Sequence, residues 1–404
     1  MVLDNSAVAR SFDRPRASDE EEKQIYNMGT TTNKISQLVP ALDLKAQYAS
    51  ICDEVHVAVE KVLQAQHFIL GPEVQELERE VPRYLDCQFG IGVASGTDAL
   101  ILALKACGIL PGDEVICPSF TFIATADAVS LLGGIPVFVD IDPITFTMDS
   151  SKIEGCITGR TKAIIPVHLY GQPADMDPIL DVAHSHNLRV VEDNAQAIGS
   201  LYKGRKAGTI GDVGCLSFFP SKNLGACGDG GMVVSNSEDT AKRVRSLRSH
   251  GAVKKYFSEE QGWNSRLDEI QASILRVKLR HLDSWTQGRV EKAKLYDSLL
   301  KGVPKVVTPT TASWGTHVFH QYTIRVPRRD HIQKFLGERG IASTVYYPTP
   351  IHLQPLYGQL KYKEGDLPET ERAAKEVLSL PIYPEITEEQ LQTVAEAICE
   401  AVDS

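Results

Sequence analysis

Short apolar runs alternate with segments of helical periodicity between residues 89 and 193, and this alternation limits the fold more than any other feature. The runs are almost continuously apolar, which is typical of strands covered on both faces of a parallel sheet. They occupy residues 89–94, 113–118, 135–141, 162–170 and 188–193. The segments between them carry apolar residues at helical spacing, for example at Leu100, Ala103, Leu104 and Cys107. Repeated strand–helix–strand units predict an α/β fold whose ligands collect at the carboxyl ends of the strands.

The pattern changes in the second half of the chain. Two apolar runs, 215–219 and 230–235, flank a glycine-rich turn and predict two strands that are joined closely. Ser265, followed three residues later by Asp268, predicts a capping-box start for a long helix.

Beyond residue 285 the pattern predicts a smaller α+β unit. Its expected elements are strands at 319–326 and 342–347, a helix near 329–338 and a last helix from Thr387. We therefore predict three parts: a polar, poorly ordered extension over 1–37, a large domain over 38–285 and a small C-terminal domain over 286–404.

Charge and cysteine content exclude several classes of protein. A net charge of -10 argues against a nucleic-acid surface, which needs clustered positive charge. Apolar runs are far shorter than the roughly 18 residues of a membrane helix, so we expect no membrane partner. The eight cysteines include no C-x-x-C pair, so we expect no metal site and reduced thiols in a cytoplasmic protein. The lack of an apolar signal core in residues 1–37 also favours the cytoplasm.

Ser95, Gly96 and Thr97 lie where a predicted strand ends and a helix begins. The free N–H groups of a helix N-terminus bind phosphate, and a glycine there lets the anion approach the backbone. The hydroxyl of Thr97 adds a further donor. Taken alone, the segment is explained more simply as an N-cap.

Asp193 ends the predicted strand over 188–193, where sheet enzymes place functional groups. A carboxylate at this point can stabilise the protonated ring nitrogen of a cofactor, and it can equally cap a helix or join an ion pair. Gln196, three residues later, can hydrogen-bond the same ligand or a loop carbonyl.

Lys222 lies in the stretch "SFFPSKNLGACGDGG", which has neither the spacing of a P-loop nor that of a dinucleotide-binding loop. A lysine at a strand end, close to a carboxylate from a neighbouring strand, suits Schiff-base chemistry, and Ser217 is placed to reach a phosphate. Without such context a lysine is most often a solvated surface charge. Asn264 and Arg266 precede the long helix, and alone they indicate only capping or surface ion pairs.

Taken in order, these segments resemble the nucleotide-sugar aminotransferases of the DegT/DnrJ/EryC1 family. The resemblance extends from about residue 39 to the end of the chain and rests on "PALDLKAQY", "ASGTDALILAL", "VVEDNAQAIGS", "SFFPSKNLGACGDGGMVV" and "NSRLDEIQASIL". It implies fold type I of the pyridoxal-phosphate-dependent transferases, the aspartate-aminotransferase fold. It also implies pyridoxal 5'-phosphate as cofactor, with pyridoxamine phosphate as its intermediate form.

The resemblance gives each candidate residue a role. It implies that Lys222 binds the cofactor as a Schiff base, that Asp193 faces the pyridinium nitrogen and that Gln196 contacts the ring hydroxyl. Asn264 matches an asparagine that reaches the phosphate from the other subunit, which implies a homodimer with shared active sites. Gly96, Thr97 and Ser217 match the positions that bind the phosphate. Phe122 matches the aromatic residue that stacks on the pyridine ring.

The implied reaction is a ping-pong transamination in which L-glutamate gives its amino group to C3 of a dTDP-linked 3-keto-deoxyhexose. The freed amine of Lys222 serves as general base for the proton shift. Relatives with histidine at this position act as dehydratases, so the lysine argues against that branch. Members that act at C4 more often have tyrosine where Ser265 stands, which favours C3.

The substrate pocket is implied less sharply. Tyr346 stands where many relatives have histidine, Phe219 replaces a frequent tyrosine and Ser249 a frequent asparagine. The expected substrate contacts are Tyr256, Arg266, His320 and Tyr346.

Three alternatives remain at this level. One is amination at C4 of a UDP-, dTDP- or GDP-linked 4-keto sugar. A second is a non-catalytic regulatory relative, against which the presence of Lys222, Asp193 and Gln196 together argues. The third is a nicotinamide-dependent dehydrogenase, which the missing glycine fingerprint disfavours.

Overall fold

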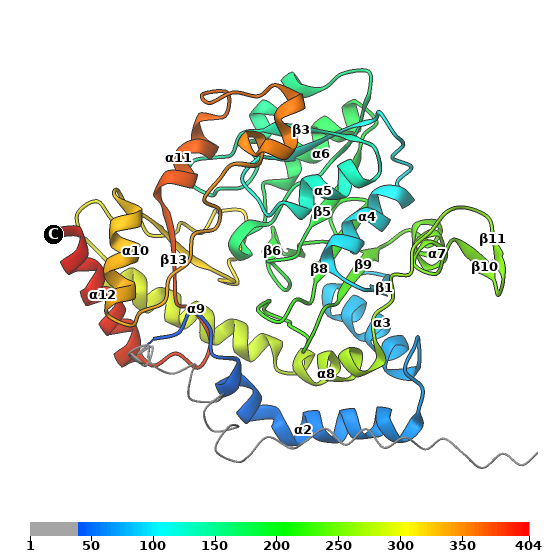
Figure 1. The fold of residues 1–404 in the computed structure, drawn as a ribbon, viewed down its shortest axis with the longest axis horizontal. Coiled ribbons are helices and arrows are strands. Elements are labelled where there is room, and N and C mark those ends of the chain that lie inside the picture. The colour runs from blue at the N-terminus through cyan, green and yellow to red at the C-terminus, as the bar shows by residue number, and fades with distance from the viewer. Residues whose placement is uncertain (1–38, 404) are drawn as a thin grey trace, which may run out of the picture.

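The computed structural model describes residues 39–403, so the prediction for the extension at 1–37 lies outside the described residues. A seven-stranded sheet in the order β1-β9-β8-β5-β4-β2-β3 forms its centre (Figure 1). The strands are β1 (Phe89–Val93), β2 (Glu114–Pro118), β3 (Ile135–Val139), β4 (Thr161–Ile164), β5 (Arg189–Asp193), β8 (Val213–Ser217) and β9 (Gly231–Ser235). Within this sheet only the pairs β1–β9 and β8–β9 are antiparallel. The predicted mostly parallel α/β sheet is confirmed.

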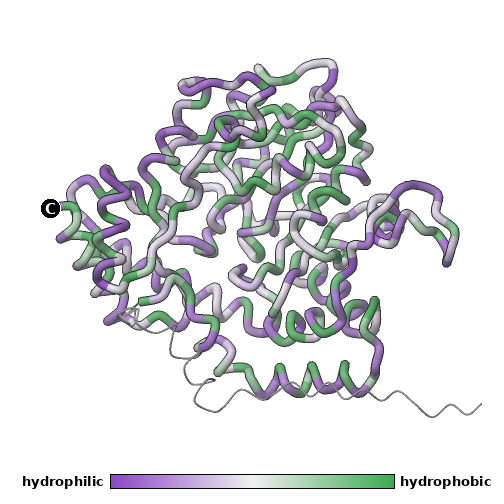
Figure 2. Tube along the Cα trace, in the orientation of Figure 1, coloured by the Kyte–Doolittle hydropathy of each residue, from purple (hydrophilic) through white to green (hydrophobic). Residues whose placement is uncertain are grey.

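Helices cover both faces of the sheet because neighbouring side chains of a strand point in opposite directions. In β2, Val115 and Cys117 pack under α4, α5 and α7, whereas Ile116 packs on the opposite face with α6. The β8–β9 end of that second face is covered by α3 and α8. Figure 2 shows the apolar segments gathered in these central layers. The helices are α3 (Pro72–Leu85), α4 (Gly96–Ala106), α5 (Ala124–Leu131), α6 (Met176–Ser185), α7 (Glu238–Leu247) and α8 (Glu269–Leu279).

A smaller unit packs around the antiparallel pair β12 (Tyr322–Arg325) and β13 (Val377–Leu380). It has its own core, built with α9 (Leu282–Leu299), α10 (Arg329–Glu338) and α12 (Glu388–Asp403). Helix α9 joins the two units, because Leu282 packs in the core of the large sheet while Ala293 and Tyr296 pack in the small one. The predicted domain boundary after residue 285 falls inside this helix and stays a prediction.

The remaining elements lie at the edges of these two units. Helix α2 (Leu44–Ala65) packs against α8 at the bottom of the view in Figure 1, and the β10–β11 hairpin projects at the right of that view. The short strands are β6 (Leu201–Tyr202), β7 (Arg205–Lys206), β10 (Ala252–Lys254) and β11 (Phe257–Ser258), and the last helix to be named is α11 (Pro368–Glu376). Short 3-10 turns occupy Ser150–Lys152, Glu154–Cys156, Leu169–Gly171, Ile351–Leu353 and Pro355–Leu360. No helix between residues 39 and 403 is both long and apolar enough to cross a membrane.

The capping-box prediction at Ser265 was wrong. Its side chain is fully buried, where Oγ accepts a hydrogen bond from the Ala94 N–H at 3.1 Å and donates to Asp98 Oδ2 at 2.6 Å. Helix α8 begins at Glu269 instead, and the predicted long helix is interrupted between α8 and α9. The serine therefore ties its loop to the start of α4, because partners distant in sequence compete with a local cap.

Two predicted strands differ from the structure: one is shorter and the other does not form. The strand predicted over 162–170 ends at Ile164, since Pro166 has no N–H for a sheet hydrogen bond. The segment 342–347 forms only single bridges, such as Thr344 with Ser379, and is not a strand. It leaves β13 because Tyr346 and Tyr347 turn toward the large sheet, where they contact Tyr170 and Gln196.

Candidate active site

Asp193 lies at the carboxyl end of β5, in the middle of the sheet, and only 6% of it is exposed. Its Oδ2 accepts a hydrogen bond from Thr125 Oγ1 at 2.8 Å, and its Oδ1 accepts one from the Ala195 N–H at 3.2 Å. Burial raises the pKa of the carboxyl, and the Thr125 hydroxyl and the charge of Lys222 oppose that rise. The site therefore holds a buried acid with two fixed donors.

A second buried carboxylate supports this strand end. Glu192 accepts hydrogen bonds from His168 Nε2 at 2.8 Å and from the backbone N–H groups of Gly208, Ile210 and Gly211 at 2.7, 2.6 and 2.6 Å. The backbone N–H of His168 in turn donates to the Asp193 carbonyl at 3.0 Å. Sequence reasoning missed both Thr125 and Glu192, although Glu192 directly precedes the predicted acid.

Lys222 lies in the turn after β8, and β8 is the parallel neighbour of β5. Its backbone N–H donates to the Phe219 carbonyl at 2.8 Å, and its amine has no hydrogen-bond partner among residues 39–403. Burial lowers the pKa of the amine to about 8, and the charge of Asp193 opposes that change. The amine is thus close to a carboxylate from the adjacent strand, as predicted, and a substantial share of it is neutral near pH 8.

The start of α4 and the end of β8 approach each other closely. A Cβ atom on Gly96 would lie 2.6 Å from Ser217 Cβ, so only glycine fits there. Ser95 caps the helix, since its Oγ accepts from the Asp98 N–H at 3.1 Å. The structure therefore brings Gly96, Thr97 and Ser217 together at a helix N-terminus, which suits a phosphate group.

Gln196, which follows Asp193 by three residues, joins a cluster of aromatic residues. The Gln196 Oε1 accepts from the Tyr170 N–H at 2.7 Å, and its Nε2 donates to the Tyr347 hydroxyl at 3.0 Å. The centroid of the Tyr347 ring lies 6.2 Å from that of the Phe122 ring, and Phe122 is 54% exposed. Sequence reasoning missed Tyr347, whose neighbour Tyr346 was the expected contact.

The expected substrate contacts fall into two groups. His320 and Tyr346 both line a cavity that Ser221, the neighbour of Lys222, also lines. Tyr256 is 94% exposed on the β10–β11 hairpin, and Asn264 is exposed as well. Arg266 is half-buried. Among residues 39–403, no hydrogen bond or ion pair joins these last three residues to Lys222, so their roles stay predictions.

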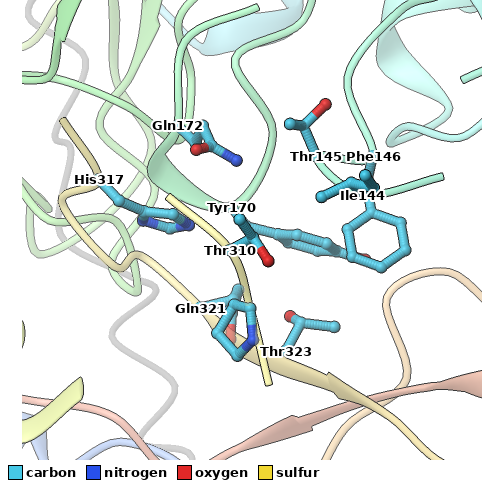
Figure 3. Close-up of a pocket in the computed structure, with 10 residues that line it drawn as sticks. Ile144, Thr145, Phe146, Tyr170, Gln172, Thr310, His317, Gln321 and Thr323 are labelled. Carbon is cyan, nitrogen blue, oxygen red and sulfur yellow. The ribbon is translucent and has the colours of Figure 1, made fainter. Parts of the chain in front are cut away.

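A separate small pocket lies beside Tyr170 (Figure 3). Polar groups of Gln172, His317 and Gln321 surround it, and the rings of Tyr170 and Phe146 form one wall. Its volume of about 10 Å³ holds no more than one water molecule. It is therefore too small for a substrate.

Together these groups fit pyridoxal phosphate. The buried carboxylate of Asp193 suits the ring nitrogen of that cofactor, and the unpartnered amine of Lys222 suits its aldehyde. The exposed Phe122 side chain suits the ring, and the helix N-terminus at Gly96 suits the phosphate. Within residues 39–403, no three histidine, cysteine or acidic residues gather in a way that could hold a metal ion. All eight cysteines are free.

Residues 50–399 match the DegT/DnrJ/EryC1/StrS aminotransferase family. A relative from Geobacillus stearothermophilus named "Pleiotropic regulatory protein" is 52% identical over 90% of this chain and 98% of its own. A UDP-N-acetyl-3-dehydro-alpha-D-glucosamine 3-aminotransferase from Acidithiobacillus ferrooxidans is 48% identical over 89% of this chain and 97% of its own. A dTDP-3-amino-3,4,6-trideoxy-alpha-D-glucose transaminase from Streptomyces venezuelae is 46% identical over 90% and 96%.

Solved structures agree with this grouping. DesV of S. venezuelae, in complex with a ketimine intermediate, superposes with a TM-score of 0.89 at 46% identity, over 91% of this chain and 99% of that one. The ntda protein of Bacillus subtilis, with bound cofactor PMP, superposes with a TM-score of 0.85 at 35% identity, over 92% and 87%. The predicted fold type is confirmed.

Proposed function

The chain belongs to the DegT/DnrJ/EryC1/StrS aminotransferase family, and on that premise we propose that it transfers an amino group from L-glutamate to C3 of a dTDP-linked 3-keto-deoxyhexose. Pyridoxal phosphate is its cofactor, as the protein with bound PMP among its structural neighbours indicates. The observation that carries the proposal is the pairing of Lys222 with Asp193 at adjacent strand ends.

When bound, pyridoxal phosphate supplies an electron sink that weakens the bonds at the carbon carrying the amino group. Asp193 would place a negative charge at the ring nitrogen, and Thr125 orients that carboxylate. The amine of Lys222 would hold the cofactor and, when not bonded to it, would take up and return the proton of the substrate carbon that carries the amino group. Gly96, Thr97 and Ser217 hold the phosphate. Phe122 excludes water from one face of the ring.

The choice of C3 rests on the relatives. Both the UDP-sugar and the dTDP-sugar relative carry the 3-amino position in their names, while they differ in the nucleotide. The alternative is amination at C4 of a UDP-, dTDP- or GDP-linked 4-keto-6-deoxyhexose. Running the reaction backwards distinguishes them: 3-amino and 4-amino nucleotide sugars are each offered with 2-oxoglutarate. We expect the 3-amino sugar to give glutamate by transferring its amino group to 2-oxoglutarate. Formation of glutamate from the 4-amino sugar alone would contradict the assignment to C3.

We propose that two copies complete each site. Asn264 and the Phe122 ring are exposed in the single chain, and so are large apolar side chains near α2, namely Tyr48, Val57, Leu63, Phe68 and Ile69. Several exposed apolar side chains on and just after one helix favour a protein–protein interface there. A homodimer would cover these side chains and would bring Asn264 to the partner's phosphate.

A non-catalytic regulatory role is the second candidate, favoured by the name of the 52% identical relative. The purified protein distinguishes the two. As an aminotransferase it should be yellow, and borohydride should fix the cofactor on Lys222, as peptide mass analysis would show. Lys222→Ala should abolish both the fixation and turnover. A colourless wild-type protein that binds no pyridoxal phosphate would leave the regulatory role. The free thiols support a cytoplasmic location for either role.

A further inference from the structure

A buried arginine near the candidate active site has no acidic partner. Arg289 of α9 is 4% exposed, and its Nη1 donates to the carbonyls of Phe319 at 3.3 Å and Ile382 at 2.8 Å. Its other N–H groups have no partner among residues 39–403, where no carboxylate lies within ion-pair distance of it. The charge of Glu385 reaches Arg289 only from a longer range. A buried charge without a counter-ion is costly, so this guanidinium is suited to an anion that arrives from outside.

A cavity beside Arg289 is lined by the residue that directly precedes Lys222. Arg289, His320, Tyr346 and Ser221 line it, and Ser221 directly precedes Lys222. The charges of both Lys222 and Arg289 help burial to lower the pKa of His320, so both cations lie near that ring. His320 is consequently neutral, and its Nδ1 donates to Asn223 Oδ1 at 3.2 Å because the Asn223 amide nitrogen already donates to the Val318 carbonyl. The positive charge that this cavity offers is therefore that of Arg289.

We infer that Arg289 binds a carboxylate of the amino-acid donor, and this inference rests on the proposed transamination. The cavity has a volume of about 50 Å³, which suits a carboxylate with a few waters. A nucleotide diphosphate is larger and carries more charge than one arginine neutralises. An amino-acid carboxylate is attached to the carbon whose nitrogen must reach the Lys222 position, which matches a cation close to that lysine.

The test uses the holoenzyme and glutarate, which has the two carboxylates of glutamate but no amine and therefore cannot react. The dissociation constant of glutarate should rise about 10- to 100-fold in Arg289→Gln, the loss expected for charge-assisted hydrogen bonds. Arg289→Lys should recover part of the lost glutarate affinity. Affinity for dTDP should stay unchanged in both variants. The matched control is Arg339→Gln, which removes an exposed arginine paired with Glu400 and should change neither affinity.

Unchanged glutarate binding in Arg289→Gln would overturn the inference, and so would a loss of dTDP affinity in its place. Either result leaves the proposed function standing if the wild-type enzyme still converts glutamate to 2-oxoglutarate. A wild-type enzyme that accepts no amino acid overturns both. If neither variant folds, a crystal structure of the wild-type holoenzyme with glutarate decides. A carboxylate within hydrogen-bond distance of Arg289 supports the inference, and glutarate bound elsewhere contradicts it.

Discussion

Burial acts in opposite directions on the two charged residues at the centre of the site. It lowers the pKa of Lys222 to about 8 and raises that of Asp193, while each charge opposes the shift of the other. An amine attacks a carbonyl carbon only when it is neutral. A lysine with an ordinary pKa near 10.4 would be almost wholly protonated at neutral pH. If Lys222 binds the cofactor as proposed, its amine is already partly neutral before the cofactor arrives.

This preparation predicts how the apoprotein recombines with pyridoxal phosphate. Below pH about 8 Lys222 is protonated, and above it the amine is neutral, so the initial rate should rise through pH 7–9 and level off above. Stopped-flow absorbance of the lysine-bound cofactor measures this rate. Lys222→Ala should show no such band at any pH. A rate that continues to climb beyond pH 10 would mean that the lysine is not perturbed.

Thr125 is expected to act through Asp193. Thr125→Val keeps the shape of the side chain but removes the donor to Asp193 Oδ2, which leaves the Ala195 N–H as the remaining hydrogen-bond donor to that carboxylate. The carboxylate then holds the charge on the ring nitrogen less well. We expect kcat to fall about 10-fold or more, with a changed pH dependence of the cofactor's absorbance. Thr125→Ser, which keeps the hydroxyl, should restore both, and a purely structural threonine would not alter the absorbance.

At the scale of elements, one buried side chain fixes the start of α3. Glu269 is 1% exposed and accepts hydrogen bonds from the N–H groups of Gly71, Glu73 and Val74 at 2.9, 2.5 and 3.2 Å. These are the free donors of the α3 N-terminus, and a carboxylate there also interacts favourably with the helix dipole. A single residue of α8 therefore supplies the cap that α3 lacks in its own sequence.

Glu269→Gln should lower the free energy of unfolding by about 2 kcal/mol, because the amide loses the charge and turns an N–H toward donors. Urea unfolding followed by circular dichroism measures the change. The matched control is Glu388→Gln, which alters an exposed glutamate in the first turn of α12 and should cost less than about 0.5 kcal/mol. Equal effects of the two substitutions would show that the cap contributes nothing.

The contrast between Glu269 and Ser265 shows what the sequence predicts well. Helices and strands with strong periodicity, such as α4 and β5, were predicted within a few residues, because their apolar pattern is local. Ser265 was predicted as a cap and instead bonds Ala94 and Asp98 more than 160 residues away. Contacts of that kind follow from tertiary packing and leave no local signal.

The same division applies to the candidate site. Lys222 and Asp193 were predicted near strand ends, and the structure places them at or just after neighbouring parallel strands. Their roles, which the family resemblance implies, stay predictions. Thr125, Tyr347 and Arg289 were missed, because a threonine, a tyrosine or an arginine inside an apolar or helical segment usually packs or faces solvent. Only the folded chain shows that Thr125 reaches Asp193 and that Arg289 lacks a counter-ion.

At the scale of the whole molecule, the single chain leaves one side of its site open. Lys222, Asp193, Gly96 and Ser217 lie together in one chain, whereas Asn264 is exposed. Its neighbour Ser265 is anchored by hydrogen bonds to Ala94 and Asp98, which fixes the loop at the start of α4. If the partner's Lys222 site receives this asparagine, the two halves of one site come from different chains.

Mixing two inactive variants tests this sharing. Lys222→Ala removes the amine, and Asn264→Asp places a negative charge beside the phosphate, so each homodimer should be nearly inactive. In a mixed dimer, one site has both defects and the other has neither. Random reassociation of equal amounts should then restore about a quarter of wild-type activity, since half of the dimers each hold one intact site. The control pairs Lys222→Ala with Asp193→Ala, two residues of the same chain's site, which should restore nothing. Absence of recovery in the first mixture would place Asn264 outside a shared site. Recovery in the control would instead contradict the assignment of Lys222 and Asp193 to one chain's site.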